Sequence, residues 1–573
     1  MQSELSPRAR RWLEAAVLPA FALLAVVVHL SAWASPTARY AGTGADTVMT
    51  IWALAWTPFA LSHHMNPLFT DYMNYPLGVN MLWNSPILVA GIALWPVTAL
   101  WGAVATFNVV MTASMALAAY FAYVAIRRFV PGLFPAVAGG LLYGFSPYMI
   151  AQELGHANLV LSALTPPVAL ILLDETLVRQ RLRWWVLSGL IAILALVQYF
   201  IWQEILLTEV LAAAVVGVIV AIVRRRDLRK RLPYATRVLI PAAALTAALL
   251  AYPVYFQFFG PALSAGNLLP DRAGYVATFV TDLLNFVVPT RVQLITPPAA
   301  QAVAVHFTGN LSEWNGYIGI PLLLFLGFVL VRYRRAPVVL AASAAAVTFA
   351  VLSLGNHLHV NGVSSVPLPW RLFSHVPLLD SVLPNRLMLY FFLAAGVLLA
   401  FGLRGLWLDR RGFAVPVLAG CFALLPLLPA APLPSTAISA PGFFSSDASG
   451  RLASGSVVLA APWPSQATPD ASNWQRVAGM RFRLLGGYYV GPDAPGDDRL
   501  RTAITRITDG RPPPALDQTT AHATLGQLTN QHVAAIVVGP SAHRNDLVTY
   551  FTALLGSPPA SLEGVDVWLL APG

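Results

Sequence analysis

The sequence predicts an α-helical polytopic membrane protein with about 11 transmembrane helices, outer-face juxtamembrane helices and a small C-terminal α/β domain. Three observations predict this class. Of the 573 residues, 57% are hydrophobic and only 10% are charged. Mean hydropathy is +0.66. Apolar runs of about 18–22 residues, the length that crosses a bilayer as a helix, recur along the chain.

The predicted spans are long apolar runs separated by polar segments. In order they are 12–34, 104–126, 133–150, 159–176, 184–201, 205–223, 237–255, 316–333, 337–354, 386–403 and 412–431. The first run has the basic flank of a signal peptide. It is too long for one and has no small-residue cleavage site, so we expect it to remain as a span.

Arginine clusters between the spans predict the orientation. They lie at 8–11, 127–128, 179–183, 224–231, 332–335 and 404–411. Basic loops stay on the cytoplasmic side, so the N-terminus is expected inside and the C-terminus outside. Segment 86–103 is also apolar enough to cross, but a crossing there would place all later clusters outside. It is interrupted by Pro96, and we expect a helix in or dipping into the outer leaflet.

Composition changes after residue 431, which predicts two domains, 1–431 in the membrane and 432–573 outside the cytoplasm. The β-type runs SVVLA (456–460), AAIVV (534–538) and DVWLL (566–570) alternate with helical patterns such as RNDLVTYFTALLG. No phosphate-binding glycine loop, nucleophile elbow or metal-ligand spacing occurs in this part of the sequence. A supporting or acceptor-guiding role is therefore expected for it.

The net charge of +10 comes from arginines between apolar runs, so orientation in the membrane explains it better than nucleic-acid binding. Nucleic acid is not expected as a partner. The single cysteine, Cys421, excludes an intrachain disulfide and a thiolate metal site.

The loop 42–83 concentrates ionisable groups directly after the first span, which is unusual in so weakly charged a chain. Asp46 follows two glycines and precedes a helical run, so it is expected at or near a helix N-cap, where it either caps or serves as a base. Asp71 lies in a Pro- and Asn-rich turn; it is a substrate-binding candidate, and turn formation is the alternative role. His63 and His64 are adjacent, so they cannot share a helix face and are not expected to ligate one metal together. They are either solvated or contact a phosphate or sugar.

Further polar groups interrupt apolar sequence at the outer ends of later spans. Such groups are costly at that depth unless they face water, one another or a ligand. The outer arginines run against the orientation bias, which an anionic ligand such as a phosphate would explain. The substrate-binding candidates of this kind are Gln152, Glu153, His156, Glu204, Glu313, Arg371 and Arg386.

The order of these features resembles the GT-C superfamily of integral-membrane glycosyltransferases. The resemblance rests on the first-loop acid, the NPLF…YPLG turn, the surface helix from Pro86 and the second span. FSPYMIAQELGHANL, EWNGYIG and LPNRLMLYF resemble a bacterial, actinobacterial branch and the YfhO-like membrane proteins. The resemblance covers residues 12–431. Many relatives carry two adjacent acids in this loop, whereas Ala45-Asp46-Thr47 has one, which leaves Asp71 or Glu153 as the second carboxylate.

The resemblance implies transfer of a sugar from a polyprenyl-phosphate-linked donor to a glycan, lipid or protein acceptor of the cell envelope, at the plasma membrane. Asp46 is then the catalytic base, Arg386 or Arg371 stabilises the departing phosphate, and direct displacement with inversion is expected. The carboxylates of Asp46, Glu153 and Glu313 suit magnesium, manganese or calcium, although their spacing does not require a metal. The alternatives are a lipid-glycan flippase or transporter, and a non-catalytic scaffold for envelope assembly.

Overall fold

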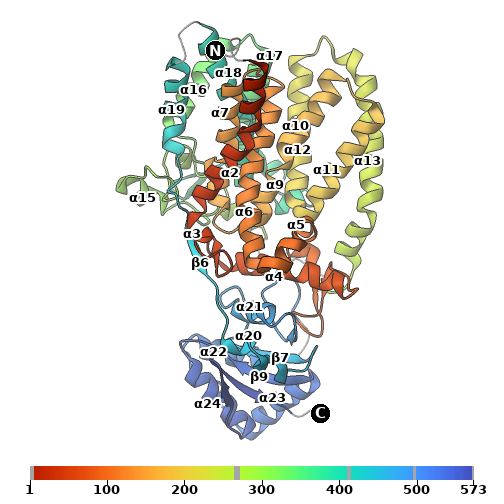
Figure 1. Cartoon of the computed structure of the whole chain (residues 1–573), viewed down its shortest axis with the longest axis vertical. Coiled ribbons are helices and arrows are strands. Elements are labelled where there is room, and N and C mark those ends of the chain that lie inside the picture. The colour runs from red at the N-terminus through yellow and green to blue at the C-terminus, as the bar shows by residue number, and fades with distance from the viewer. Residues whose placement is uncertain (1–5, 264–271, 410–413, 494–497, 571–573) are drawn as a thin grey trace. The chain divides into compact units, whose positions relative to one another are not determined.

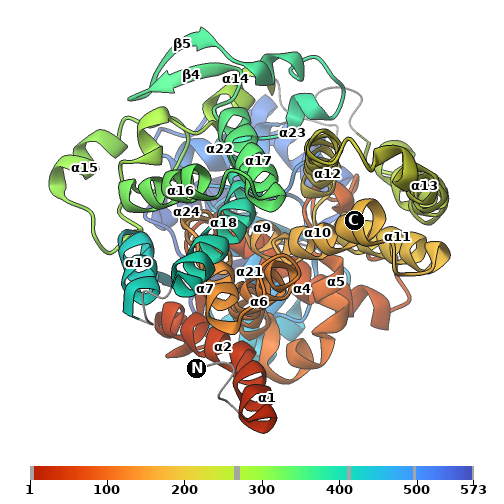
Figure 2. The same cartoon turned by 90° about the horizontal axis from the view of Figure 1, so that it is seen from above.

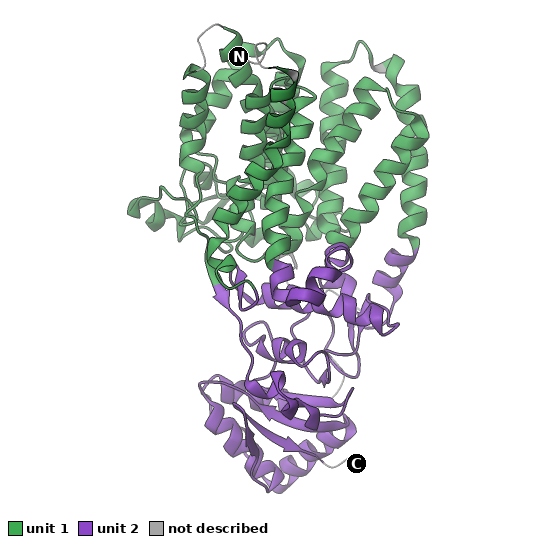
Figure 3. Ribbon diagram, viewed as in Figure 1, with its two compact units in different colours: residues 1–36, 108–251, 269–435 green, residues 37–107, 252–268, 436–573 purple. Residues whose placement is uncertain are grey.

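The computed structural model describes residues 6–263, 272–409, 414–493 and 498–570. It divides into two compact units (Figure 3). Unit 1 draws on residues 1–36, 108–251 and 269–435, and unit 2 on residues 37–107, 252–268 and 436–573. Unit 2 therefore contains both the first loop and the C-terminal sheet. The domain boundary at residue 431 stays a prediction.

Unit 1 is a bundle of helices (Figure 1). Its first half contains α1 (Pro7–Ala15), α2 (Val17–Val28), α3 (Leu30–Trp33), most of α6 (Trp95–Arg127), α7 (Leu133–Gly144), α8 (Pro147–Gln152), α9 (Ala157–Ser162), α10 (Thr165–Asp174), the π-helical turn η2 (Glu175–Arg179), α11 (Trp184–Ile201), α12 (Gln203–Val223) and most of α13 (Leu228–Phe259).

The second half of unit 1 mixes short loop helices with long ones. It contains α14 (Arg272–Thr278), η3 (Leu283–Phe286), α15 (Pro298–Ala304), α16 (Ile320–Tyr333), α17 (Pro337–Ser353), β4 (His357–Val360), β5 (Val363–Pro367), η4 (Pro369–Leu372), η5 (Leu379–Ser381), η6 (Pro384–Leu387), α18 (Met388–Leu408), α19 (Ala414–Leu424) and η7 (Leu425–Leu427). α18 is buried along most of its length and packs against α7, α16, α17 and α19 (Figure 2).

The helical membrane fold expected from the sequence is confirmed. Within the described ranges, eight helices are long and apolar enough to cross a membrane, and each coincides with a predicted span. They are Arg11–Val28, Trp95–Arg127, Leu133–Gln152, Ala157–Arg179, Trp184–Ile201, Gln203–Val223, Arg229–Phe259 and Pro384–Leu408. The chain is thus a multi-pass membrane protein.

Three of the predicted spans form shorter apolar helices. For 316–333 the helix α16 has 14 residues, because Gly319 takes a positive φ of 77° and the chain enters the helix only at Ile320. The span 337–354 becomes α17, with 17 residues. In 412–431, α19 has 11 residues and continues as the 3₁₀ turn η7, where Pro426 cannot extend an α-helical ladder. Residues 412 and 413, and Arg410 and Arg411 of the last basic cluster, lie outside the described residues.

Segment 86–103 is helical but broken. It contains α5 (Leu88–Ala93) and the start of α6, and the backbone leaves helical geometry at Gly102, with φ 80° and ψ 167°. α5 packs against α4 (Ala45–Ser62), and a Cβ added to Gly91 would lie 2.8 Å from the Cβ of Thr57. This close approach explains the glycine. That segment 86–103 lies in or dips into the outer leaflet stays a prediction.

Unit 2 contains a five-stranded sheet of order β10-β11-β9-β7-β8. Its strands are β7 (Val457–Ala461), β8 (Arg483–Leu484), β9 (Val533–Val538), β10 (Ala560–Leu562) and β11 (Val565–Leu569). β7 is parallel to β8 and β9, and β11 is antiparallel to β9 and β10. The helices of this part are α20 (Gly442–Ser445), η8 (Asp447–Arg451), α21 (Asp470–Val477), α22 (Arg499–Thr508), α23 (Gln518–Asn530) and α24 (Arg544–Leu555).

The three β-type runs and the helical pattern singled out in the sequence correspond to β7, β9, β11 and α24. Successive strand residues face opposite sides of a sheet. Val457 and Leu459 accordingly pack with α22, α23 and α24 residues in one cluster, whereas Val458 and Ala460 pack with α20 and α21 residues in another. Both faces of the sheet are covered, which explains why β7 is buried at every position.

The remaining part of unit 2 is built from the first loop and the end of α13 (Leu228–Phe259). It consists of β1 (Arg39–Ala41), α4, β2 (Phe69–Thr70), β3 (Val79–Asn80), η1 (Met81–Trp83), α5, the start of α6 and the end of α13. β1 pairs with β6 (Ser435–Ala437). The side chain of Asn80 donates to the carbonyl of Phe256, and the Trp83 indole donates to the carbonyl of Gln257. These bonds attach the end of α13 to the first loop.

Candidate functional site

Asp46 lies in the first turn of α4, half-buried. Gly44, with φ 97°, turns the chain into the helix and occupies the N-cap without a side-chain bond. The expectation that Asp46 lies near a helix N-cap is therefore confirmed, because Asp46 is the second residue after the N-cap residue Gly44. The backbone N–H groups of a helix N-terminus stabilise negative charge, so this position favours the carboxylate form.

The Asp46 carboxylate accepts a hydrogen bond from the Tyr488 hydroxyl. Tyr488 follows β8 in the segment GGYYV, 442 residues further along the chain. Sequence reasoning missed this residue because no local pattern connects it with the first loop. A hydrogen bond from a neutral donor to a carboxylate is charge-assisted, and it fixes the orientation of the acid.

Backbone contacts on both sides of Tyr488 attach its segment to the first loop. Before it, the N–H of Tyr75 donates to the Leu484 carbonyl at 3.1 Å, and the N–H of Asn74 donates to the Gly486 carbonyl at 3.1 Å. After it, the side chain of Asn84 donates to the Val490 carbonyl at 2.8 Å and accepts from the Val490 N–H at 2.5 Å. Tyr488 is thus positioned by the backbone as well as by its own hydroxyl.

α4 is held by α21 through one buried amide. The side chain of Gln475 accepts from the Trp52 indole at 2.7 Å and donates to the carbonyls of Tyr72 and Phe482, each at 2.7 Å. Gln475 is fully buried, and Trp52 stacks on Trp56 with ring centroids 5.5 Å apart. These contacts fix the helix that carries Asp46.

The other ionisable residues of the first loop lie elsewhere in unit 2. Asp71 forms an ion pair with Arg483 at 3.2 Å, so its carboxylate has a structural partner. His63 and His64 are exposed at the C-terminal end of α4, and the His63 ring packs on Phe59 with centroids 4.2 Å apart. Helix geometry puts them about 25 Å from Asp46 along the axis. The structure therefore does not bring the histidines to Asp46.

In unit 1, five of the substrate-binding candidates meet in one buried group that we call the Arg386 cluster. It consists of Gln152, His156, Glu204, Glu313, Asn385 and Arg386. The guanidinium of Arg386 contacts Glu313 at 2.6 Å and also pairs with Glu204. Residues from α8, α12, η6 and the loop before α16 are joined in this way, although their sequence positions are far apart.

The remaining bonds of the Arg386 cluster hold its two carboxylates. Asn385 donates to Glu313 at 2.8 Å and Gln152 donates at 3.3 Å, while His156 lies 3.8 Å from the same carboxylate. Complete burial of Glu313 favours its neutral form, but the Arg386 guanidinium and His156 outweigh this and hold the pKa of Glu313 below its ordinary value. Glu204 accepts from the Leu383 N–H at 3.0 Å and from the Trp202 indole at 3.1 Å.

Glu153 is separate from this cluster, although it follows Gln152 directly. It is fully buried and lies 3.0 Å from the His29 ring, whose other nitrogen is 3.0 Å from the Ala25 carbonyl. Burial raises the pKa of Glu153, and the neighbouring His29 opposes that rise. His29 was not singled out from the sequence, because a lone histidine inside an apolar run has no local signature.

Arg371 in η4 has an exposed side chain, in contrast to Arg386.

Several polar atoms near the Arg386 cluster have no hydrogen-bond partner in the part of the chain that the structure describes. They are the Tyr148 hydroxyl, the side-chain amide oxygen of Asn385 and one carboxylate oxygen of Glu153. Buried polar atoms of this kind are usually satisfied by water or a ligand.

The side chains named above do not form a metal-binding group. Across residues 6–570 apart from the three undescribed gaps, no three His, Cys, Asp or Glu side chains are arranged to hold a metal ion. Of the three carboxylates considered for a divalent ion, Glu153 pairs with His29 and Glu313 with Arg386. Their donor sets therefore do not fit a shared metal.

The chain was compared with protein families, curated sequences and solved structures. A family model described as "Domain of unknown function (DUF6311)" matches residues 16–424. No curated protein sequence matches the chain. The structure is similar to the arabinofuranosyltransferase AftD from Mycobacteria, with a TM-score of 0.55 and 16% identity over 99% of this chain and 42% of that one. The chain thus spans less than half of that protein.

Two further solved structures are similar at lower scores. The oligosaccharyltransferase of Archaeoglobus fulgidus gives a TM-score of 0.49 and 13% identity, over 91% of this chain and 68% of that chain. ArnT from Cupriavidus metallidurans gives 0.42 and 12%, over 98% of each chain. Of these three structures, only AftD has a TM-score above 0.5, and at 16% identity it informs the fold alone.

Proposed function

This chain belongs to the DUF6311 family and has the fold of the GT-C membrane glycosyltransferases, and from that premise we propose that it transfers a sugar from a polyprenyl-phosphate-linked donor to an acceptor outside the cytoplasm. The observation that carries the proposal is the half-buried carboxylate of Asp46, held at a helix N-terminus by the Tyr488 hydroxyl. A general base needs an ionised, oriented carboxylate, and this arrangement supports both requirements.

In the proposed reaction, Asp46 accepts the proton of the acceptor hydroxyl as that oxygen attacks the anomeric carbon of the donor sugar. The bond between the anomeric carbon and the phosphate oxygen breaks, and its electron pair leaves with the polyprenyl phosphate. The phosphate is a good leaving group, so one displacement with inversion suffices. Tyr488 acts as a positioning residue, because its hydroxyl bonds to the base.

Different arginines are proposed for structure and for substrate. Arg386 already pairs with two carboxylates, the half-buried Glu204 and the buried Glu313, which supports a structural role. Arg371, with its exposed guanidinium, is therefore our candidate for the departing phosphate. The reaction side is proposed to lie opposite the arginine clusters, that is, outside the cytoplasm.

An assay with purified protein in lipid nanodiscs tests the proposal and its two alternatives together. The protein receives a radiolabelled polyprenyl-phosphate sugar and candidate glycan, lipid or protein acceptors. A transferase gives release of polyprenyl phosphate that depends on the acceptor. A flippase moves the labelled lipid between leaflets without releasing it, and a scaffold does neither. Absence of acceptor-dependent release with every donor and acceptor class would contradict the proposal.

A further inference from the structure

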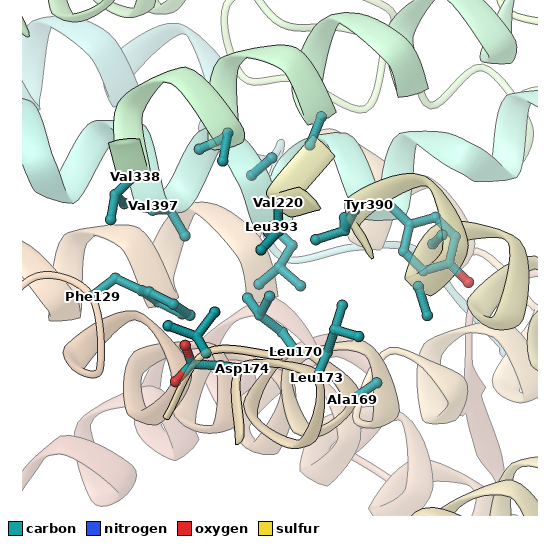
Figure 4. Close-up of a pocket in the computed structure, with 18 of the residues that line it drawn as sticks. Phe129, Ala169, Leu170, Leu173, Asp174, Val220, Val338, Tyr390, Leu393 and Val397 are labelled. Atoms are coloured by element: carbon teal, nitrogen blue, oxygen red, sulfur yellow. The ribbon is translucent and has the colours of Figure 1, made fainter. Parts of the chain in front are cut away.

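Unit 1 contains an apolar groove of about 420 Å³ between α10, α12, α17 and α18. Its wall is formed by side chains such as Leu170, Leu173, Val220, Val338 and Leu393 (Figure 4). The candidate site residues described above do not line it. We call it the α12 groove.

Charged residues gather at one end of the α12 groove. Arg128 and Arg179 both pair with Asp174, at 3.1 and 2.7 Å, and Arg128 also pairs with Glu175. These charges compensate one another. Arg224, at the C-terminal end of α12, also lines the groove, and among the described residues its half-buried guanidinium has no hydrogen-bond or ion-pair partner. This end therefore carries an uncompensated positive charge.

The opposite end of the α12 groove is also polar, and its polar residues are Tyr390 and Glu209. Tyr390 lies there, on the far side of the apolar wall from Asp174 (Figure 4), and its hydroxyl is bonded to Thr208 at 2.9 Å. Glu209 lines the groove with 7% of its surface exposed, and its Oε1 has no hydrogen-bond partner. Contact between a hydrocarbon chain and a carboxyl group without a hydrogen-bond partner is not favourable. Glu209 therefore marks the inner end of the apolar wall.

The length of the α12 groove matches one leaflet of a bilayer. Glu209 and Arg224 are both on or at the end of α12, and helix geometry separates them by about 22 Å. A bilayer with its headgroups is about 40–45 Å thick, so half of it is about 20–22 Å. With Arg224 at the headgroup level, the apolar wall reaches to about the middle of the membrane.

We propose that the α12 groove binds one anionic phospholipid, with an acyl chain along the apolar wall and its phosphate on Arg224. The occupant follows from charge and shape together, since the wall suits hydrocarbon and the uncompensated guanidinium suits a phosphate. A zwitterionic lipid offers the same chain but has no net charge for Arg224. This lipid is separate from the sugar donor, because Arg224 lies among the arginine clusters, opposite the side on which the transfer reaction is proposed.

Native mass spectrometry of delipidated protein tests this site. The probes are phosphatidylglycerol and phosphatidylcholine with identical acyl chains. Wild-type protein is expected to retain one phosphatidylglycerol at least tenfold more tightly than phosphatidylcholine. Arg224→Gln should weaken phosphatidylglycerol binding about tenfold, because one charge-assisted contact is lost. Arg225→Gln is the matched control, since Arg225 is the exposed neighbour and does not line the groove.

A second pair of variants tests the apolar wall. Ala341 lines the groove on α17, whereas Ala344 is exposed on the same helix outside it. Ala341→Phe should displace the lipid, and Ala344→Phe should not. Size-exclusion profiles and thermal unfolding check that all four variants are folded.

Three results would overturn the proposal. They are equal retention of the two phospholipids, equal effects within either variant pair, and polyprenyl phosphate displacing phosphatidylglycerol at equal concentration. The last would identify the groove as a donor-lipid site. Binding is read without a sugar donor or acceptor, so failure here leaves the transferase assay unaffected, and the reverse also holds.

Discussion

The Tyr488 hydroxyl donates a hydrogen bond to the Asp46 carboxylate, joining the segment after β8 to the first turn of α4. The consequence is that the C-terminal part of the chain contributes directly to the candidate site. Its role is then to position the proposed base, which is more specific than the supporting or acceptor-guiding role expected from sequence.

Tyr488→Phe removes this bond while keeping the ring. We expect kcat to fall about 10- to 100-fold, the equivalent of one charge-assisted hydrogen bond, with little change in KM because the acceptor and donor contacts remain. Steady-state kinetics of sugar transfer measure this. Tyr489→Phe is the control, since the neighbouring hydroxyl bonds to the exposed Asp493. A rise in KM at unchanged kcat would contradict the positioning role.

Gln475→Leu should loosen α4 from α21. The substitution leaves the buried Trp52 indole and the Phe482 carbonyl without their partner, whereas the Tyr72 carbonyl keeps the Leu484 N–H as a donor. Unsatisfied buried groups cost about 1–3 kcal/mol each, so the two groups together predict a destabilisation of about 2 kcal/mol or more. Thermal unfolding in detergent measures it against Gln518→Ala, an exposed position on α23. Equal melting temperatures for the two variants would show that this amide does not hold the helix.

Arg386→Met should destabilise unit 1 by about 3–5 kcal/mol, because it leaves the buried Glu313 and the half-buried Glu204 without their cation. Adding Glu204→Gln and Glu313→Gln to the same chain should recover part of this loss. Chemical or thermal unfolding of the single and triple variants provides the comparison. A stable single variant with a raised KM for the donor would instead support phosphate binding by Arg386.

Acid should weaken the Arg386 cluster. The pKa of Glu313 is held below its ordinary value, so its ionised form contributes stability above about pH 4.3, the value for an unfolded glutamate. That contribution is lost as the pH falls through the lower folded pKa. Melting temperatures between pH 7 and pH 3.5 should therefore drop more steeply for wild type than for Glu313→Gln. Parallel curves would mean that Glu313 is not ionised in the folded protein.

Much of the fold could be predicted from local sequence. Apolar runs located the membrane helices, and alternating or continuous β-type residues located β7, β9 and β11, because both signals are periodic over neighbouring residues. The ends of the shortened helices were harder to predict, since they depend on single residues such as Gly319 and Pro426. Hydropathy does not detect such breaks.

The candidate site could be predicted only in part. Polar residues in apolar sequence identified Gln152, Glu204, Glu313 and Arg386 individually, because such groups are costly unless satisfied. Their mutual pairing depends on helix packing between distant segments and has no local sequence signal. Tyr488 was missed for the same reason, since nothing in GGYYV indicates contact with a residue 442 positions earlier.

Acceptor-dependent release of polyprenyl phosphate by Asp46→Asn protein tests the central claim most directly. Asp546→Asn is the matched control, because Asp546 also lies in the first turn of a helix, α24, and is exposed. With wild type and the control active, the account predicts that Asp46→Asn loses about 10²–10⁴-fold in kcat, the range for a general base, while still binding the donor. Release by Asp46→Asn at the wild-type rate would contradict it.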